Sequence, residues 1–399
     1  MIWIGVVIFV VALLFSIMFH ETGHFVTAKM FGMKCTRFFV GMGPTVWSTW
    51  RGETEYGIKA LPIGGFVKIV GMHSLDELDD PEDEPRSFRS KPGWQRVIVL
   101  SAGSFMHFVL AFAILVGMAL TLGIENDNTV QLGTVITCLA PNVTDLNNGT
   151  CGDAAHQPSP AAIAGLRVGD QVTSFNGTPV SNWTQLSNVI KAASPGQTVS
   201  LTVLRDGKTL HLSTKLAQVK GRKGAYMGIA PAVVFQVASP VGAVSFFGSA
   251  VAQEISGSVS AISALPKAVP KLFTKERSDT NAGQIQSMVG VAEDTGQAVE
   301  ANVGWRPKVA YVLLIIASIN IFVGVLNMLP LLPMDGGHVA LVLWERIRAR
   351  FARLRGRPDP GLVDMQKVLP VMFSIFMVIV FFSVVLMIAD IVNPVSGGA

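Results

Sequence analysis

Residues 1–24 read MIWIGVVIFVVALLFSIMFHETGH, an uncharged apolar run that ends directly in two histidines and a glutamate. A helix that spans a bilayer needs roughly 17–25 apolar residues. Three further blocks without Asp, Glu, Lys or Arg occupy residues 97–124, 309–334 and 368–389. The 399 residues are half hydrophobic and 15% charged, against about 25% in soluble proteins. The sequence therefore predicts a polytopic α-helical membrane protein with four transmembrane helices, and excludes a disordered or fibrous chain.

The distribution of basic residues predicts the orientation, because loops rich in Lys and Arg stay on the cytosolic side. Residues 344–367 contain six arginines, and basic residues also flank the helix ends in residues 29–96. Both segments are therefore expected in the cytosol, with residues 125–308 and both termini outside. The net charge of +4 is not gathered in one basic stripe, so no nucleic-acid partner is expected.

The two long loops differ in pattern. Residues 37–71 alternate apolar and polar residues around Gly64 and Gly65, which predicts a cytosolic β-hairpin. The acidic residues that follow, 76–84, are interpreted as a solvated linker. In the external segment, Cys138 and Cys151 share an Asn/Gly-rich loop, which favours a disulfide between them over two free thiols. Residues 244–262 carry an apolar stripe at helical spacing, either a packing face or a helix on the bilayer surface.

The histidines that end the first apolar run have the spacing of a metal site. His20 and His24 are four residues apart, so on a helix both imidazoles face the same side and can bind one Zn²⁺. A bound zinc lowers the pKa of water from 15.7 to about 7, and Glu21 is then the expected general base. Ionisable groups are costly inside a spanning helix, which argues against a chance match.

A catalytic zinc usually has three protein ligands, and Asp335 is the best candidate for the third. It follows Pro330 and Pro333, which interrupt the third apolar block, and it precedes Gly336-Gly337. Irregular backbone at membrane depth occurs where it lines a cavity or is buried in protein. The alternative is that Asp335 only caps the next helix at the membrane surface.

Two other polar residues lie in the apolar blocks. Asn327 can donate to a developing oxyanion or form a hydrogen bond between helices, and the two roles are equally well supported. His107 is expected to be a neutral, hydrogen-bonded core residue rather than a ligand. His338 can reach the metal on a helix, but the two glycines before it make that geometry doubtful.

The motif at residues 20–24, paired with residues 327–337, resembles the site-2 protease family of intramembrane zinc metalloproteases (M50 type). The resemblance implies one Zn²⁺ per chain, held by His20, His24 and Asp335. It also implies Glu21 as the catalytic base and Asn327 as transition-state stabiliser. Where the family commonly has Gly-Pro-x-x-Asn, residues 103–107 read Gly-Ser-Phe-Met-His. This departure is expected to touch no metal ligand.

The resemblance covers most of the chain. Residues 159–180 look like the core of a bacterial PDZ domain, which the family inserts between its second and third spanning helices. The element around Gly64 and Gly65 resembles a membrane-associated β element that binds substrate. One PDZ domain and four spans are most similar to the actinobacterial type. The expected segments are a first span at 1–33, β region 34–72, linker 73–96, span 97–124, PDZ (α+β) domain 134–218, helical region 240–300, span 309–338, basic loop 339–367 and span 368–390.

The resulting hypothesis is an intramembrane zinc metalloprotease in a bacterial cell membrane. It would cut transmembrane segments of proteins already trimmed outside the membrane, such as anti-sigma factors. The PDZ domain would either capture a new C-terminus or exclude substrates with bulky external domains. The alternatives are a transporter or metal-permeation protein, whose broken helices would look similar, and a non-catalytic membrane scaffold that displays the PDZ domain.

Overall fold

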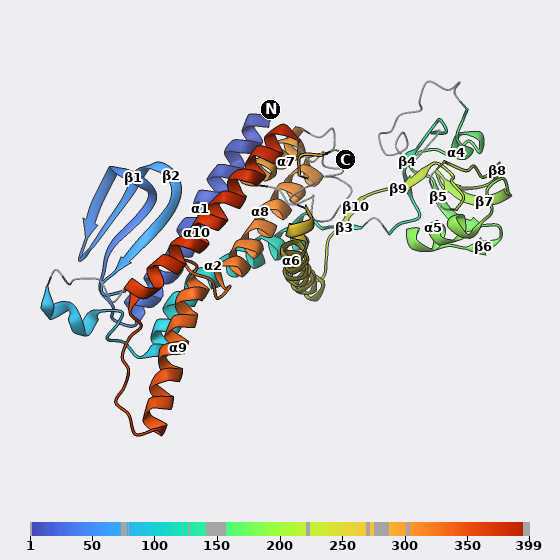
Figure 1. Cartoon of the computed structure of the whole chain (residues 1–399). Helices are drawn as coiled ribbons and strands as arrows, with labels where there is room; N and C mark the ends of the chain where they lie inside the picture. Colours follow the sequence, from blue (N-terminus) through green and yellow to red (C-terminus); the bar gives the residue numbers. More distant parts are fainter. Residues whose placement is uncertain are drawn as a thin grey trace. The chain divides into compact units, whose positions relative to one another are not determined.

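The computed structural model describes residues 2–72, 78, 80–126, 128–140, 157–220, 224–268, 272–274, 287–300 and 304–393 (Figure 1). The chain forms two compact units. The first unit consists of Met1–Thr121 and Ala238–Ala399, and the second of Leu122–Val237. The second unit is thus inserted between two helices of the first, as the sequence predicts.

Four helices of the first unit are long and apolar enough to cross a membrane. They are α1 (Ile2–Met30), α2 (Gly93–Thr121), α8 (Trp305–Asn327) and α10 (Met365–Val392). The shortest has 23 residues, which gives about 35 Å at 1.5 Å per residue, more than the roughly 30 Å of a hydrocarbon core. Within the described part of the chain, there are thus four candidate spans, as predicted, and the third ends at Asn327 and not at residue 338.

Small residues let these helices approach closely. A Cβ atom added at Gly23 of α1 would lie 2.5 Å from the Ala102 carbonyl oxygen on α2. A Cβ at Gly324 of α8 would lie 3.2 Å from the Cβ atom of His107 on α2. Such contacts are typical of helix packing in lipid, where close van der Waals contact replaces the hydrophobic effect. Helix α2 is therefore held directly against both α1 and α8.

The predicted β-hairpin is present as β1 (Cys35–Arg51) and β2 (Thr54–Ile69). Its tight turn is at Gly52, which has φ 62°, so Gly64 and Gly65 lie within β2 and do not form the turn. Both strands bend, and residues 37–40 of β1 pair with residues 55–58 and also with residues 65–68 of β2. The segment of β2 that contains the two glycines is consequently an outer strand of this small sheet.

The acidic stretch after the hairpin is more ordered than predicted. Residues Pro81–Arg86 form a short 3₁₀ helix, η1. Asp83 forms an ion pair of 2.6 Å with Lys34, and Glu84 one of 2.6 Å with Arg89. The interpretation as a solvated linker is therefore wrong for residues 80–89, because these acids are paired with bases at the foot of the hairpin.

A break separates α8 from α9 (Asp335–Leu354). A Cβ added at Gly336 would lie 2.3 Å from the carbonyl oxygen of Met328, and one at Gly337 would lie 2.7 Å from that of Leu331. The two glycines are thus needed for α9 to begin directly against the break. The prediction of a basic loop at 339–367 is wrong for its first half, because α9 continues as a helix to Leu354.

The predicted helical region after the inserted unit contains α6 (Pro240–Ala268) and α7 (Met288–Glu300). Phe247 of α6 packs edge to face on Phe112 of α2, with ring centroids 5.2 Å apart. Glu254 of α6 accepts a hydrogen bond from Ser318 of α8. The apolar stripe on α6 therefore includes a packing face against the spanning helices.

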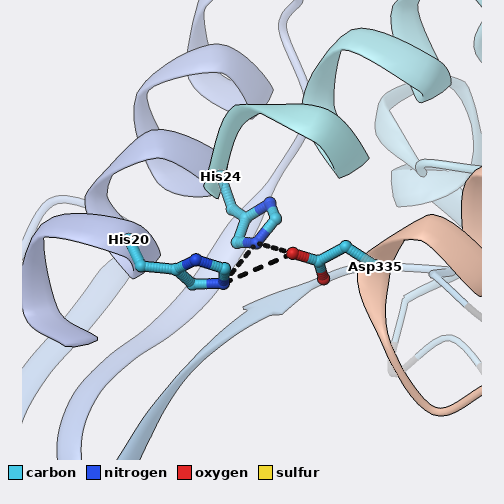
Figure 2. Close-up of side chains that lie close together, drawn as sticks. All are labelled: His20, His24 and Asp335. Carbon is cyan, nitrogen blue, oxygen red and sulfur yellow. Dashed lines mark hydrogen bonds and ion pairs between the residues drawn. The ribbon is translucent and has the colours of Figure 1, made fainter. Parts of the chain in front are cut away.

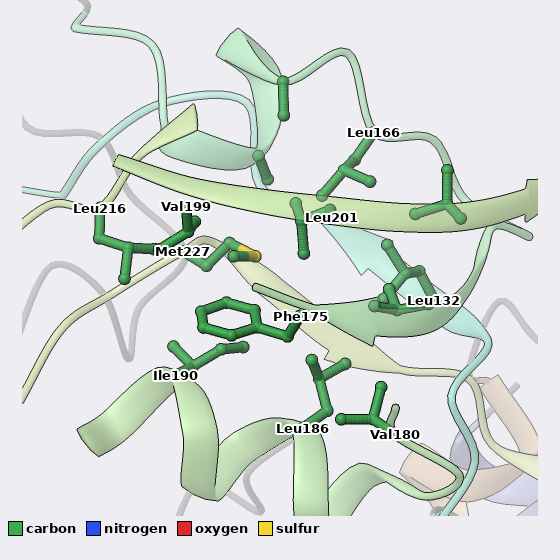
Figure 3. Close-up of a cluster of buried hydrophobic side chains, with 14 of the residues drawn as sticks. Leu132, Leu166, Phe175, Val180, Leu186, Ile190, Val199, Leu201, Leu216 and Met227 are labelled. Carbon is green, nitrogen blue, oxygen red and sulfur yellow. The ribbon is translucent and has the colours of Figure 1, made fainter. Parts of the chain in front are cut away.

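The second unit is built around a four-stranded sheet in the order β6-β5-β7-β8. These strands are β5 (Gln171–Phe175), β6 (Thr178–Pro179), β7 (Thr198–Arg205) and β8 (Lys208–Lys215), and two helices, α4 (Pro160–Ile163) and α5 (Trp183–Ala192), accompany them. Figure 3 shows its core, where Phe175, Leu186 and Leu201 are buried. Asp170 is also buried and accepts two hydrogen bonds from Arg205, at 2.7 and 2.8 Å.

The unit is wider than the predicted 134–218. Its two ends are tied by short antiparallel pairs, β3 (Ile124–Asn126) with β10 (Val234–Gln236) and β4 (Leu132–Val135) with β9 (Ile229–Pro231). Strands of three or four residues leave too little pattern to be found in the sequence. Cys138 is disulfide-bonded and Cys35 is free and buried, whereas Cys151 lies outside the described residues.

Candidate metal centre

Three predicted ligands from two distant segments meet inside the first unit. His20 and His24 lie near the end of α1, and Asp335 begins α9 (Figure 2). The two imidazole Nε2 atoms are 3.1 Å apart, and each is 3.4 Å from Oδ2 of Asp335. Both histidines are buried. Among the described residues, these three form the group able to hold a metal ion.

The spacing of these atoms fits a tetrahedral zinc. Zn–N and Zn–O bonds of about 2.0–2.2 Å place neighbouring ligand atoms about 3.3–3.6 Å apart, close to the observed 3.1, 3.4 and 3.4 Å. Two nitrogens and one carboxylate oxygen are also a donor set that zinc commonly takes in catalytic sites. The three residues therefore fit Zn²⁺ and leave one position for a water or substrate.

The tautomer of His24 is set by its neighbour on α2. Its Nδ1 lies 2.7 Å from the carbonyl oxygen of Val99, and because a carbonyl can only accept, Nδ1 carries the proton. The Nε2 lone pair of the neutral ring is then free to bind a metal, an arrangement that also fixes the ring orientation. Helix α2 thus orients a ligand that it does not itself supply.

A glycine on α2 provides the space for both imidazoles. A Cβ atom at Gly103 would lie 2.3 Å from Nε2 of His24 and 2.6 Å from Cε1 of His20. The next residue, Ser104, places its hydroxyl 3.5 Å from Oδ2 of Asp335. Residues 103–107 contribute no atom to the cluster of three, as expected, but Gly103 and Ser104 line the site.

Glu21 lies between the histidines and the hairpin. It is partly buried, and its carboxyl group interacts with the backbone N–H of Val67 on β2 and with the charges of His24 and Asp335. A Cβ at Gly65 would lie 3.3 Å from Cγ of Glu21. The structure thus brings the predicted base, the ligands and the glycine-containing strand together.

Two other polar residues are placed differently. Asn327 is the last residue of α8 and is half-buried, and its side chain forms no hydrogen bond with any other described residue. His338 lines a small cavity with Phe88, Arg96 and Glu345 and is not part of the ligand cluster. Neither residue belongs to the cluster formed by His20, His24 and Asp335.

The family model of peptidase family M50 matches residues 8–358. The chain belongs to peptidase family M50. This M50 peptidase is 32% identical to the zinc metalloprotease Rip1 of Mycolicibacterium smegmatis and 34% identical to Rip1 of Mycobacterium tuberculosis H37Rv, in each case over 98% of both chains. It is 26% identical to the regulator of sigma-W protease RasP of Bacillus subtilis, over 86% of this chain and 90% of that one. The predicted family, the class of zinc metalloprotease and Zn²⁺ as cofactor are confirmed.

The M50 peptidase is also similar to solved structures of PDZ domains. The PDZ domain of the SdrC-like protein of Listeria monocytogenes is 19% identical to this chain. The match covers 27% of this chain and 90% of the PDZ-domain chain, with a TM-score of 0.19. A TM-score this low does not establish a shared fold. The strand order β6-β5-β7-β8 of the second unit is defined by the hydrogen bonds between its strands.

Beside the ligands, the M50 peptidase has a buried polar network that the sequence reasoning missed in part. The carboxamide oxygen of Asn320 on α8 accepts hydrogen bonds from the Ser16 hydroxyl, at 2.5 Å, and from Nδ1 of His107, at 2.9 Å. The amide orientation follows from its NH₂ group, which donates to the Ile316 carbonyl at 2.8 Å. The His107 ring lies 4.9 Å from that of His20, centroid to centroid. His107 is therefore a hydrogen-bonded core residue, as expected, and it supports a ligand.

A sequence signal for this network exists. Ser16, His20 and His24 recur every four residues, so they share one face of α1. Ser104 and His107, three residues apart, share a face of α2 in the same way. Polar side chains are rare in lipid-spanning helices, so their common spacing marks the faces that pack toward the site.

Proposed function

We propose that His20, His24 and Asp335 bind the zinc of this protease. The observation that supports this proposal is the set of three interatomic distances of 3.1–3.4 Å between one carboxylate oxygen and two imidazole nitrogens. When bound there, the metal polarises a carbonyl and lowers the pKa of a water to about 7. The chain's own part is to hold the three ligand atoms at fixed spacing, through Val99, Gly103 and the break before α9.

We further propose that Glu21 is the general base. Its carboxylate follows His20 directly on α1 and lies within electrostatic reach of His24 and Asp335. In this position it takes a proton from the attacking water and returns it to the leaving amine, a role worth about 10²–10⁴ in rate. Asn327 is proposed as a donor to the oxyanion. Its side-chain amide, which forms no hydrogen bond with the residues that the structure describes, lies directly before the break and supports that role.

The substrate is a transmembrane segment of another protein. A substrate helix protects its own peptide bonds, so it must be unwound before attack. Gly64 and Gly65 lie in the outer segment of β2, and Gly65 is next to Glu21. We propose that an extended substrate pairs with this edge through main-chain hydrogen bonds. At Gly65 the missing side chain lets this strand lie close to Ile17 and Glu21 of α1.

Anti-sigma factors are the proposed substrate class, because RasP is named a regulator of sigma-W protease. The protein is proposed to lie in a bacterial cell membrane, with the termini and the inserted unit outside and the basic residues 344–367 inside. The excess of arginines in that short segment supports this orientation. The inserted unit is proposed to be a PDZ domain that receives or filters pre-trimmed substrates.

A single substitution tests the assignment of the base. Glu21→Gln removes the carboxylate and leaves all three ligands in place, so this variant should still bind one zinc per chain. Its cleavage of a co-expressed transmembrane substrate should fall by at least about 10²-fold. Glu82→Gln is the matched control, since Glu82 is exposed on η1, and it should cleave like the wild type.

Zinc content and cleavage are measured on the same purified samples. Undiminished cleavage by Glu21→Gln would contradict the role of Glu21. If a variant with both His20→Ala and His24→Ala bound zinc as well as the wild type does, the proposed ligand set would be wrong.

A further inference from the structure

A basic groove lies at the end of the membrane-spanning region that is marked by the first residues of α2 and α10. It has a volume of about 850 Å³ and lies between α9, the start of α2 and residues 359–362. Gly93, the first residue of α2, lines it, and residues 359–362 lead directly into α10 at Met365. Because α2 and α10 are both candidate spans, the groove is at the level where a bilayer's headgroups begin.

One wall of the groove is a row of guanidinium groups. Arg346, Arg350 and Arg353 occupy positions i, i+4 and i+7 of α9, so they share one face. All three are exposed, and none forms a hydrogen bond or ion pair with another described residue. Facing them is Asp359, with a single carboxylate. The groove therefore has an excess of positive charge that no described acidic group neutralises.

Other charged residues in the groove and beside it have structural partners. Arg96 and Glu345 form an ion pair of 2.9 Å and are each about one-eighth exposed. Arg348 donates hydrogen bonds to the carbonyl oxygens of Pro360 and Gly361, at 3.3 and 3.1 Å. These contacts hold the loop against α9 and keep the groove open without using the row of three arginines.

A row of apolar side chains runs beside the arginines. Ile347, Phe351 and Leu354 are 47%, 58% and 75% exposed. Each lies one residue after an arginine of the row, so the two rows are adjacent faces of the same helix. A helix bathed in water has no reason to expose three large apolar residues on one face. Adjacent cationic and apolar faces are typical of a helix at a lipid surface.

We propose that this groove binds the phosphate headgroup of an anionic phospholipid. Guanidinium groups bind phosphate oxygens in a bidentate manner, and basic pockets beside spanning helices suit acidic headgroups. Ile347, next to Arg346 at the level of Gly93, would contact the uppermost acyl carbons of the same leaflet, and Phe351 and Leu354 would lie against its headgroup layer. An acidic peptide would match the charge of the groove. It would leave the apolar row exposed, which favours lipid over peptide.

The test uses the full chain in nanodiscs of phosphatidylcholine, with or without phosphatidylglycerol, and native mass spectrometry of the lipid retained after release. The wild type should retain phosphatidylglycerol well above its share in the disc. Each arginine near an anionic surface contributes about fivefold in affinity, so Arg346→Gln with Arg350→Gln should lower retention about 25-fold. The matched control, Arg355→Gln with Arg357→Gln, removes two charges just beyond the end of α9 and should retain lipid within about threefold of the wild type.

Several outcomes would overturn the proposal. If the wild type showed no preference for phosphatidylglycerol, there would be no site, whatever the variants do. Equal loss in the two double variants would indicate only a diffuse basic surface. If inorganic phosphate at millimolar concentration displaced the lipid, the ligand would be a free anion. If a glutamate-rich peptide displaced it, the occupant would be an acidic protein segment.

Discussion

An alanine at Gly103 is expected to disable the proposed metal centre, although α2 supplies none of the proposed ligands. Its Cβ atom would lie 2.3 Å from Nε2 of His24 and 2.6 Å from Cε1 of His20. Non-bonded contacts between such atoms have their optimum at about 3.5 Å, so one or both imidazoles must retreat by about 1 Å. Metal–ligand distances tolerate only about 0.2 Å, and a 1 Å misplacement costs about 10²-fold in rate.

We therefore expect Gly103→Ala to lower kcat/KM about 100-fold and to weaken binding of Co²⁺, used as a spectroscopic substitute for zinc. The matched control is Gly117→Ala on the same helix, where an added Cβ meets no atom within 4 Å. Alanine is a better helix former than glycine by about 0.5–1 kcal/mol, so this control should be active and slightly more stable. The assays are cobalt titration, cleavage of a transmembrane substrate and thermal unfolding of the metal-free protein. Activity of Gly103→Ala within about threefold of the wild type would refute the reasoning.

Three further predictions concern other parts of the molecule. His107→Ala removes a buried donor to Asn320 and the ring beside His20, so cobalt affinity should fall about 10–100-fold. His107→Asn should recover the affinity. Full affinity in the alanine variant would show that His107 does not support His20. Hydrogen bonds from one arginine and one lysine lower the pKa of Glu53 to about 2, so its stabilisation is complete above pH 4.5 and is lost as the pH falls toward 2. After allowance for solvent screening, Glu53 contributes about 1 kcal/mol to stability. The difference in unfolding temperature between wild type and Glu53→Gln should therefore vanish as the pH falls from 4.5 toward 2. Asp170→Asn should destabilise the inserted unit by about 3 kcal/mol, because the guanidinium of Arg205 loses its carboxylate; hydrogen exchange of residues 157–220 measures this, and unchanged protection would contradict it.

The local parts of the site could be predicted from the sequence. His20, Glu21 and His24 follow from helical spacing alone, because residues four apart must share a face. Asp335 follows from the rule that irregular backbone inside a membrane lines a cavity or is buried. The four spans follow from length and lack of charge. In each case the information lies within one short segment and needs no knowledge of how the segments pack.

The remaining features depend on contacts between distant segments. Gly103 is one of 39 glycines in the chain, and only the crossing of α1 and α2 shows that it must lack a side chain. Asn320 is bonded to Ser16, which is 304 residues away, so no local pattern connects them. The sequence did not show where the hairpin turns, because Gly52, Gly64 and Gly65 all lie in this region, and a bend and a turn both favour glycine.

The geometry of the proposed zinc site is a property of the packing of three helices. His20 and His24 lie on one helix, but their rings are positioned by Val99 and Gly103 on α2, and the third proposed ligand, Asp335, comes from α9. Lipid offers no hydrogen bonds, so the polar groups in this region must satisfy one another. Asn320 of α8 does this by accepting hydrogen bonds from Ser16 of α1 and His107 of α2, close to His20. Any change that lets α2 move away from α1 should therefore weaken metal binding, even where every ligand is intact.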